Sequence, residues 1–191
     1  MDTELTERQK EIINASLELI DESGIQSLTI KNISKKVGLV ESAIYRHYRS
    51  KTQILIALLD TICEQTGYRN ETEVASVFEF IEKKLANHFQ TFQKNPALVS
   101  VVFAEDLFQN VPELVVKTRL QMERSLSALS ELIQQGQRQG EIRSDIDPGI
   151  ISVMINGSLR MLVKQWRMSA YSFNLTSRGK KLIASYKLML K

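Results

Sequence analysis

Apolar residues recur along this chain at steps of three and four, and this spacing limits what the chain can fold into. Strand-like alternation of apolar and polar residues is nearly absent, and only three prolines and eight glycines interrupt the 191 residues. Because 43% of the residues are apolar, the chain can bury a substantial core. We therefore predict an all-α protein.

Capping signals indicate where the first helices begin and end. Thr6 and Gln9 have the spacing of a capping box, and Gly24 is a stop signal. Thr29 is expected to cap a short second helix that ends at Gly38. The four N-terminal helices are expected at about 6–23, 29–38, 41–48 and 50–67.

A polar stretch at 67–73, GYRNETE, is expected to join two modules. Longer amphipathic segments follow it, and they are separated by Asn95-Pro96, Val111-Pro112, the glycines at 136–140 and Asp147-Pro148. The helices expected in this part are about 74–94, 97–109, 112–138, 148–168 and 176–190.

Composition argues against several classes of function. Cys63 is the single cysteine, and the two histidines, His47 and His88, are far apart in the sequence, so we expect no disulfide and no metal site. No phosphate-binding loop or Ser/His/Asp pattern is present, so we expect neither an enzyme nor a cofactor. No apolar run reaches the roughly 20 residues of a membrane span, and the N-terminus lacks a signal-peptide pattern. A cytoplasmic protein without membrane contact is the expectation.

Charge is distributed unevenly along the first 51 residues. Residues 1–22 carry seven acidic and two basic side chains, whereas residues 23–51 carry six basic side chains and one acidic side chain, Glu41. A local basic surface is therefore expected in the second stretch, and a polyanion is a candidate partner.

Residues 38–51, GLVESAIYRHYRSK, follow a short helical pattern that ends at Val37. Two short helices joined by a glycine-containing turn form the unit that places its second helix in the major groove of DNA. Here Gly38 lies in the turn, and Ile44 is spaced for the interior. The plainer interpretation is a basic, solvated face on an ordinary helical hairpin.

In the DNA-binding interpretation, the start of the second helix reaches base edges. Glu41, Ser42 and Ala43 hold that position. Tyr45 and Lys51 suit phosphate contacts, the first as a neutral hydroxyl donor and the second as a charge.

Residues 6–59 resemble the DNA-binding domain of the TetR family of bacterial transcriptional regulators. The resemblance is carried by Thr29, Gly38, Leu39, Val40-Glu41, Ser42-Ala43, Ile44, Tyr45, Arg46, His47, Tyr48, Arg49-Ser50 and Lys51. Two positions depart from the family pattern. Val40 stands where serine or threonine is common, and Ser42 stands where glycine is common.

The resemblance implies a role for each matching residue. Candidate DNA contacts are Thr29, Lys31, Glu41, Ser42, Ala43, Tyr45, Arg46, His47 and Lys51. Among them, Lys31 is expected to touch phosphate or a neighbouring base, and Arg46 is expected to approach base edges. Tyr45, His47 and Lys51 are expected to hold the DNA backbone.

The resemblance also implies a division of the chain into domains. A helix-turn-helix DNA-binding domain is expected at 1–51, a connecting helix and joint at 52–73, and a helical effector-binding and dimerisation domain at 74–191. Double-stranded DNA with a palindromic operator is the expected partner, because one short helix reads few base pairs and a homodimer reads two half-sites.

The last two helical segments carry more apolar surface than one face needs. In regulators of this type, two such helices pair with their mates across a two-fold axis. The dimerisation residues expected on this basis are Ile151, Met154, Ile155, Leu159, Leu162, Trp166, Leu182, Ile183 and Tyr186.

Helically spaced apolar residues of the middle segments are candidates for the wall of an effector pocket, although such a stripe is more often plain core. They are Phe89, Phe92, Phe103, Leu107, Met122 and Leu126. His88, Glu105 and Asp106 are possible polar contacts. Arg160, Lys164 and Arg167 fall on one helical stripe, which is either an exposed face or a site for an acidic effector such as a carboxylate or an acyl-coenzyme A.

The function that these features predict is a ligand-responsive transcriptional regulator, foremost a repressor, released from DNA by a small hydrophobic or acidic effector. The alternative is a DNA-bound adaptor whose C-terminal domain binds a protein partner of cell division or of the chromosome. A closed apolar pocket favours the first and an exposed patch favours the second.

Overall fold

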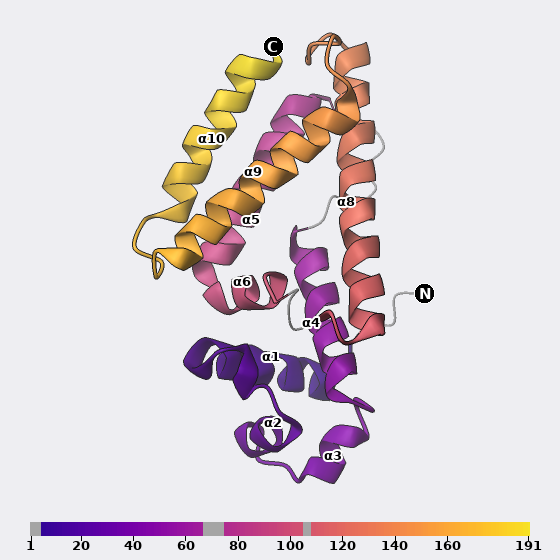
Figure 1. The fold of residues 1–191 in the computed structure, drawn as a ribbon, viewed down its shortest axis with the longest axis vertical. Coiled ribbons are helices and arrows are strands. Elements are labelled where there is room, and N and C mark those ends of the chain that lie inside the picture. The colour runs from indigo at the N-terminus through magenta and orange to yellow at the C-terminus, as the bar shows by residue number, and fades with distance from the viewer. Residues whose placement is uncertain (1–4, 67–74, 105–107) are drawn as a thin grey trace. The chain divides into compact units, whose positions relative to one another are not determined.

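The structure of the protein, a computed structural model, describes residues 5–66, 75–104 and 108–191, and all regular structure in these ranges is helical (Figure 1). The helices are α1 (Glu7–Ser23), η1 (Ile25–Ser27), α2 (Ile30–Lys36), α3 (Glu41–Tyr45), α4 (Lys51–Thr66), α5 (Val77–Lys94), α6 (Pro96–Val102), α8 (Pro112–Arg138), α9 (Pro148–Met168) and α10 (Leu175–Leu190). The prediction of an all-α protein is confirmed. None of the described helices is long and apolar enough to cross a membrane.

The chain divides into two compact units. The first comprises Met1–Ile62 and Pro96–Thr118, and the second comprises Cys63–Asn95 and Arg119–Lys191. These units are not the predicted domains, whose limits at residues 51 and 73 stay predictions.

Local capping explains why the first helices begin where they do. Thr6 and Gln9 form the expected capping box, in which the Thr6 hydroxyl accepts from the Gln9 amide at 3.3 Å and the Gln9 side chain accepts from the Thr6 amide at 3.0 Å. At α2, the Thr29 hydroxyl accepts a hydrogen bond from the backbone amide of Asn32 at 3.1 Å. Both predicted caps are confirmed.

Two helices end earlier than expected. After α3, the amide of His47 bonds the carbonyl of Ile44 at 3.0 Å, so the chain tightens into a turn that lets Tyr48 enter the core. At the end of α6, the amide of Ala104 likewise bonds the carbonyl of Val101 at 3.2 Å. Such tight bonds over three residues are typical of helix ends.

The first unit packs α1, α2 and α3 around a set of aliphatic side chains. Side chains of this unit that are 0% exposed include Ile12, Leu28, Ile33 and Ile44, together with Ile54 and Leu58 of α4. On the surface, the Lys36 ammonium joins α2 to α1 through Glu22 at 2.7 Å and Glu18 at 3.2 Å. Hydrogen bonds to Glu22 and then to Glu18 raise the pKa of Lys36.

The second unit contains α5, α9 and α10, with the C-terminal part of α8. Phe89 of α5 is 1% exposed, and its ring lies against the backbone of Gly179 in α10. Helix α9 and helix α10 run side by side (Figure 1), and the Tyr186 hydroxyl donates to the Met154 carbonyl at 3.1 Å. The core of this unit is therefore formed by α5, α9 and α10, which pack closely against one another.

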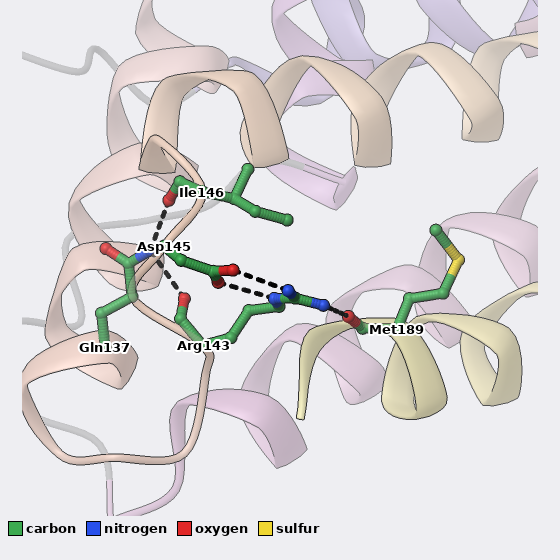
Figure 2. Close-up of polar contacts among 5 residues, drawn as sticks. All are labelled: Gln137, Arg143, Asp145, Ile146 and Met189. Atoms are coloured by element: carbon green, nitrogen blue, oxygen red, sulfur yellow. Dashed lines mark hydrogen bonds and ion pairs between the residues drawn. The ribbon is translucent and has the colours of Figure 1, made fainter.

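The segment between α8 and α9 holds the last turn of α10 (Figure 2). The backbone amide of Arg143 donates to the Leu190 carbonyl at 2.8 Å, and its guanidinium donates to the Met189 carbonyl at 3.4 Å. Two bonds of 2.7 Å join the same guanidinium to Asp145. This hydrogen-bonded guanidinium lowers the pKa of Asp145 to about 2.

The same segment also caps the start of α5. The Glu141 carboxylate accepts from the Ser76 hydroxyl at 2.8 Å and from the backbone amides of Val77 and Phe78 at 3.2 and 3.1 Å. Burial by itself raises the pKa of Glu141, but these hydrogen bonds outweigh it and the pKa lies below its usual value.

Candidate functional site

The turn between α2 and α3 depends on Gly38. Its φ of +68° lies in the left-handed region, which side chains other than glycine rarely adopt. The turn is closed by a hydrogen bond of 2.8 Å from the Leu39 amide to the Ser34 carbonyl. The glycine predicted for this turn is confirmed.

Helix α3 has one buried face and one exposed face. Ile44 is 0% exposed and fixes the helix to the core of the first unit. Glu41, Ser42 and Arg46 are exposed, and Tyr45 is 50% exposed. Most of the candidate contacts on α3 are therefore exposed together and can meet one partner at the same time.

The remaining DNA-contact candidates lie around α3. Thr29, Lys31 and Lys51 are exposed, and no ion pair joins Lys31, Arg46 or Lys51 to another described residue. Ala43 and His47 are half-buried. Lys36, by contrast, is engaged by the carboxylates of α1, so it adds less to the basic surface than its place in the sequence indicates.

Tyr48 follows α3 by three residues and is buried. Its side chain is 5% exposed, and its hydroxyl has no hydrogen-bond partner among the described residues. Burial raises the pKa of Tyr48 to about 12. The residue therefore supports the helix from inside and presents no polar group to a partner.

Replacing Tyr48 by phenylalanine removes an unpaired buried hydroxyl and leaves the aromatic ring in place. We expect Tyr48→Phe to increase the free energy of unfolding by up to about 1 kcal/mol, because burial of an unpaired polar group is unfavourable. Urea denaturation of the two proteins measures this difference. A loss of more than 1 kcal/mol, within the ~1–3 kcal/mol range for breaking a buried hydrogen bond, would contradict the assignment of an unpaired hydroxyl.

The residues predicted for dimerisation lie mainly inside the protomer. Six of them are 7% exposed or less: Ile151, Ile155, Leu159, Trp166, Ile183 and Tyr186. Leu162 and Leu182 are half-buried, and Met154 is 39% exposed. These six side chains pack within their own chain, so they leave little surface for a second copy.

A set of apolar residues that shares only Met154 with this prediction forms the exposed face of α9, which we call the α9 stripe. It consists of Ile150, Val153, Met154, Met161 and Met168, each at least 39% exposed. Leu188 and Met189 of α10 are 86% and 49% exposed. Sequence reasoning missed most of this stripe, although its spacing of three, four and seven residues is a helical signal on the side opposite Ile151 and Ile155.

The candidate pocket residues are distributed over both units. Phe89 and Phe92 are buried in the second unit, where Leu126 is half-buried and Met122 is 55% exposed. Phe103 is half-buried in the first unit. Leu107, Glu105 and Asp106 lie outside the described residues. The role of these residues in ligand binding stays a prediction.

Comparison with known proteins identifies related families and folds. Residues 12–58 match the family described as bacterial regulatory proteins, tetR family, and residues 52–191 match the YsiA-like protein, C-terminal region, of the same family. The chain is 26% identical over 170 residues, 87% of each protein, to the Fatty acid metabolism regulator protein of Bacillus subtilis (strain 168).

A second relative matches part of the chain. The Nucleoid occlusion factor SlmA of Glaesserella parasuis serovar 5 is 32% identical over 99 residues, 50% of this chain and 49% of the relative. Among solved structures, the transcriptional regulator FadR from Bacillus subtilis, in complex with stearoyl-CoA, superposes with a TM-score of 0.75 at 24% identity. That match covers 92% of this chain and 95% of the other.

These matches agree with the helix-turn-helix of α2 and α3 and with the helical second part of the chain, and the family match over residues 52–191 covers more than half of the sequence. The chain is therefore a member of the TetR family of bacterial transcriptional regulators.

Proposed function

We propose that this protein is a homodimeric repressor that binds a palindromic operator and is released by an acyl-coenzyme A. The observation that carries the proposal is the similarity to the Fatty acid metabolism regulator protein, which extends over 87% of both chains and so includes the part beyond the helix-turn-helix. A relative that shared only the first domain would support DNA binding and say nothing of the effector.

The arrangement of α3 supports the DNA-binding part of the proposal. Its first turn is exposed, while Ile44 and Tyr48 hold the opposite face in the core. In this geometry the first turn of α3 enters the major groove, with Ser42 and Arg46 at base edges. Tyr45 and Lys51 then lie against the phosphates.

The α9 stripe supports the dimer. Five apolar side chains on one face of α9 are exposed, as are Leu188 and Met189 of α10, and a soluble protein rarely leaves so much apolar surface uncovered. A second copy related by a two-fold axis covers this stripe with the same stripe of its own. The residues of the dimer interface are then the exposed members and not the six buried ones.

Three basic side chains of α9 support an effector that carries negative charge. Lys164 is exposed on α9, and Arg160 and Arg167 beside it are half-buried. Cationic side chains on one helix attract the phosphates and carboxylates that acyl-coenzyme A thioesters and fatty acids carry. The acyl chain requires an apolar pocket, for which Phe92 and Leu126 remain the candidates.

A binding titration tests the proposal. A duplex selected from random DNA by the purified protein at about 0.15 M salt serves as the operator, since salt suppresses sequence-independent binding. Stearoyl-CoA, free coenzyme A and stearate are then added separately. We expect stearoyl-CoA alone to weaken operator binding about 5- to 150-fold.

Tyr45→Ala provides the control for the DNA part. We expect this variant to bind all duplexes more weakly, with or without stearoyl-CoA, because it loses a phosphate contact and no base contact. Unchanged DNA binding by Tyr45→Ala would show that α3 is not the recognition helix. Equal responses to the three additives would show that the effector is not an acyl-coenzyme A.

The similarity to the nucleoid occlusion factor supports the second candidate, a DNA-bound adaptor for another protein. That similarity covers half of this chain, whereas the similarity to the fatty acid regulator covers 87%. An operator complex that persists at saturating stearoyl-CoA and at saturating stearate favours the adaptor.

A further inference from the structure

Val40 is the residue that precedes the first turn of α3, and its side chain is 69% exposed. In α1, α2, α5, α9 and α10 this position is held by a polar residue whose side-chain oxygen accepts a hydrogen bond from the helix. Valine has no such oxygen and is among the least favourable residues at this position. Helix α3 therefore lacks a stabilising contact that these five helices have, and that the Ser50 hydroxyl also supplies to α4 by accepting from the Gln53 amide at 3.2 Å.

The backbone at Val40 is nevertheless that of an ordinary helix cap. Its φ of −82° and ψ of 153° are extended, and its carbonyl accepts the amide of Ala43 at 3.0 Å. A serine or threonine would fit this backbone without strain and would supply the missing hydrogen bond. Local structure thus favours a different residue.

Packing does not explain the valine either. The core beneath α3 is filled by Ile44 and Tyr48, at 0% and 5% exposed. Val40 contributes little to that core, since 69% of its surface remains open to solvent. An explanation therefore has to come from a partner that meets this end of α3.

The chemistry of the two residues at this end indicates which base edge they meet. Neither Val40 nor the carboxylate of Glu41 has a side-chain hydrogen-bond donor. Phosphates and the major-groove edge of guanine present only acceptors, so these two side chains suit neither. Thymine fits Val40, because its major-groove edge presents a 5-methyl group, and cytosine or adenine fits Glu41, because each presents an amino donor.

We propose that Val40 packs against the 5-methyl group of a thymine, and so selects thymine at one position in each half-site of the operator. This inference rests on the proposed function, in which α3 lies in the major groove. The contact is apolar and excludes water from the methyl group. Glu41 is the neighbour that accepts from the amino group of an adjacent cytosine or adenine.

Substitution of thymine by deoxyuridine tests the contact, because the two bases differ only by the methyl group. The probe is the duplex selected from random DNA at about 0.15 M salt, with each symmetric pair of thymines replaced in turn. Burying one methyl-sized group changes an equilibrium constant by about fourfold. We therefore expect one thymine pair whose replacement weakens binding about fourfold for each half-site, or roughly 15-fold for both.

Val40→Ser is the decisive variant. We expect it to bind the thymine and deoxyuridine duplexes with equal affinity, and to be more stable to urea because serine caps α3. This combination separates a specificity role from a structural one, which would change stability and leave the thymine dependence intact. Val116→Ser, at a valine of α8 that is 46% exposed, is the matched control and should keep the full thymine dependence.

Each outcome bears on one of the two proposals. The contact with thymine is excluded if no replacement of thymine by deoxyuridine weakens binding of the parent protein. It is also excluded if Val40→Ser loses as much affinity as the parent on that replacement. In both cases the proposal of DNA binding stands. Failure to recover any motif from random DNA overturns the proposed function itself. A further pair of duplexes carries cytosine or 5-methylcytosine where the thymine stood. Tighter binding to the 5-methylcytosine duplex supports the methyl contact.

Discussion

Gly179→Ala is expected to lower the free energy of unfolding by about 3 kcal/mol, the upper end of the usual range for overpacking a core. A Cβ at this position would lie 2.2 Å from Cδ2 and 2.6 Å from Cε2 of Phe89. The Phe89 ring is 1% exposed, so it cannot move toward solvent without opening the seam between α5 and α10. Urea denaturation at one fixed protein concentration measures the loss.

Gly157→Ala is the matched control, because both glycines lie inside helices of the second unit. Gly157 falls between Met154 and Met161 on the α9 stripe, so both glycine substitutions are compared in the Met161→Glu background, which is expected to be monomeric. Nothing lies within 4 Å of a Cβ built at Gly157. Alanine is about 1 kcal/mol better than glycine in a helix, so this variant should be as stable as the parent or more stable. A combined Phe89→Leu and Gly179→Ala protein should recover part of the loss. Equal effects of the two glycine substitutions would contradict the close packing of α10 on Phe89.

Met161→Glu is expected to convert the dimer into monomers and to weaken binding to a palindromic duplex by about 100-fold. Met161 is 57% exposed at the middle of the α9 stripe. In a two-fold interface each copy would bury a carboxylate next to its symmetry mate, and an unpaired buried charge is strongly unfavourable. Two linked recognition helices gain about 10²- to 10⁴-fold over separate ones, and this gain is lost. Sedimentation measures the oligomer, and fluorescence anisotropy measures the affinity.

Met122→Glu supplies the comparison, since Met122 is a helical methionine of nearly equal exposure, 55%, outside the α9 stripe. This variant should remain dimeric and bind DNA without effector as the parent does. If Met161→Glu stays dimeric, the two copies meet through another surface.

Helix boundaries were predictable where short-range chemistry determines them. The capping box of Thr6 with Gln9 and the cap of Thr29 on Asn32 act over three residues, so the sequence displays both partners together. The end of α3 was not predictable in this way. It depends on the burial of Tyr48, which the rest of the first unit decides.

The candidate dimer surface shows why longer-range features escape such reasoning. Helix α9 carries apolar residues on two faces, and the set chosen from the sequence was the face that α5 and α10 cover. The same holds for Phe89. An aromatic residue at helical spacing has the same sequence pattern whether it lines a cavity or packs between two helices. Here the Phe89 ring packs against Gly179, which lies 90 positions later in the chain, so Phe89 belongs to the contact between α5 and α10.

The segment between α8 and α9 has a consequence for how the second unit opens. Helices unravel from their ends, yet Glu141 secures the first turn of α5 and Arg143 secures the last turn of α10. Breaking this one segment releases both ends at once. Amide protons in the two turns should therefore exchange with solvent at similar rates, as members of a single cooperative unit instead of two fraying ends.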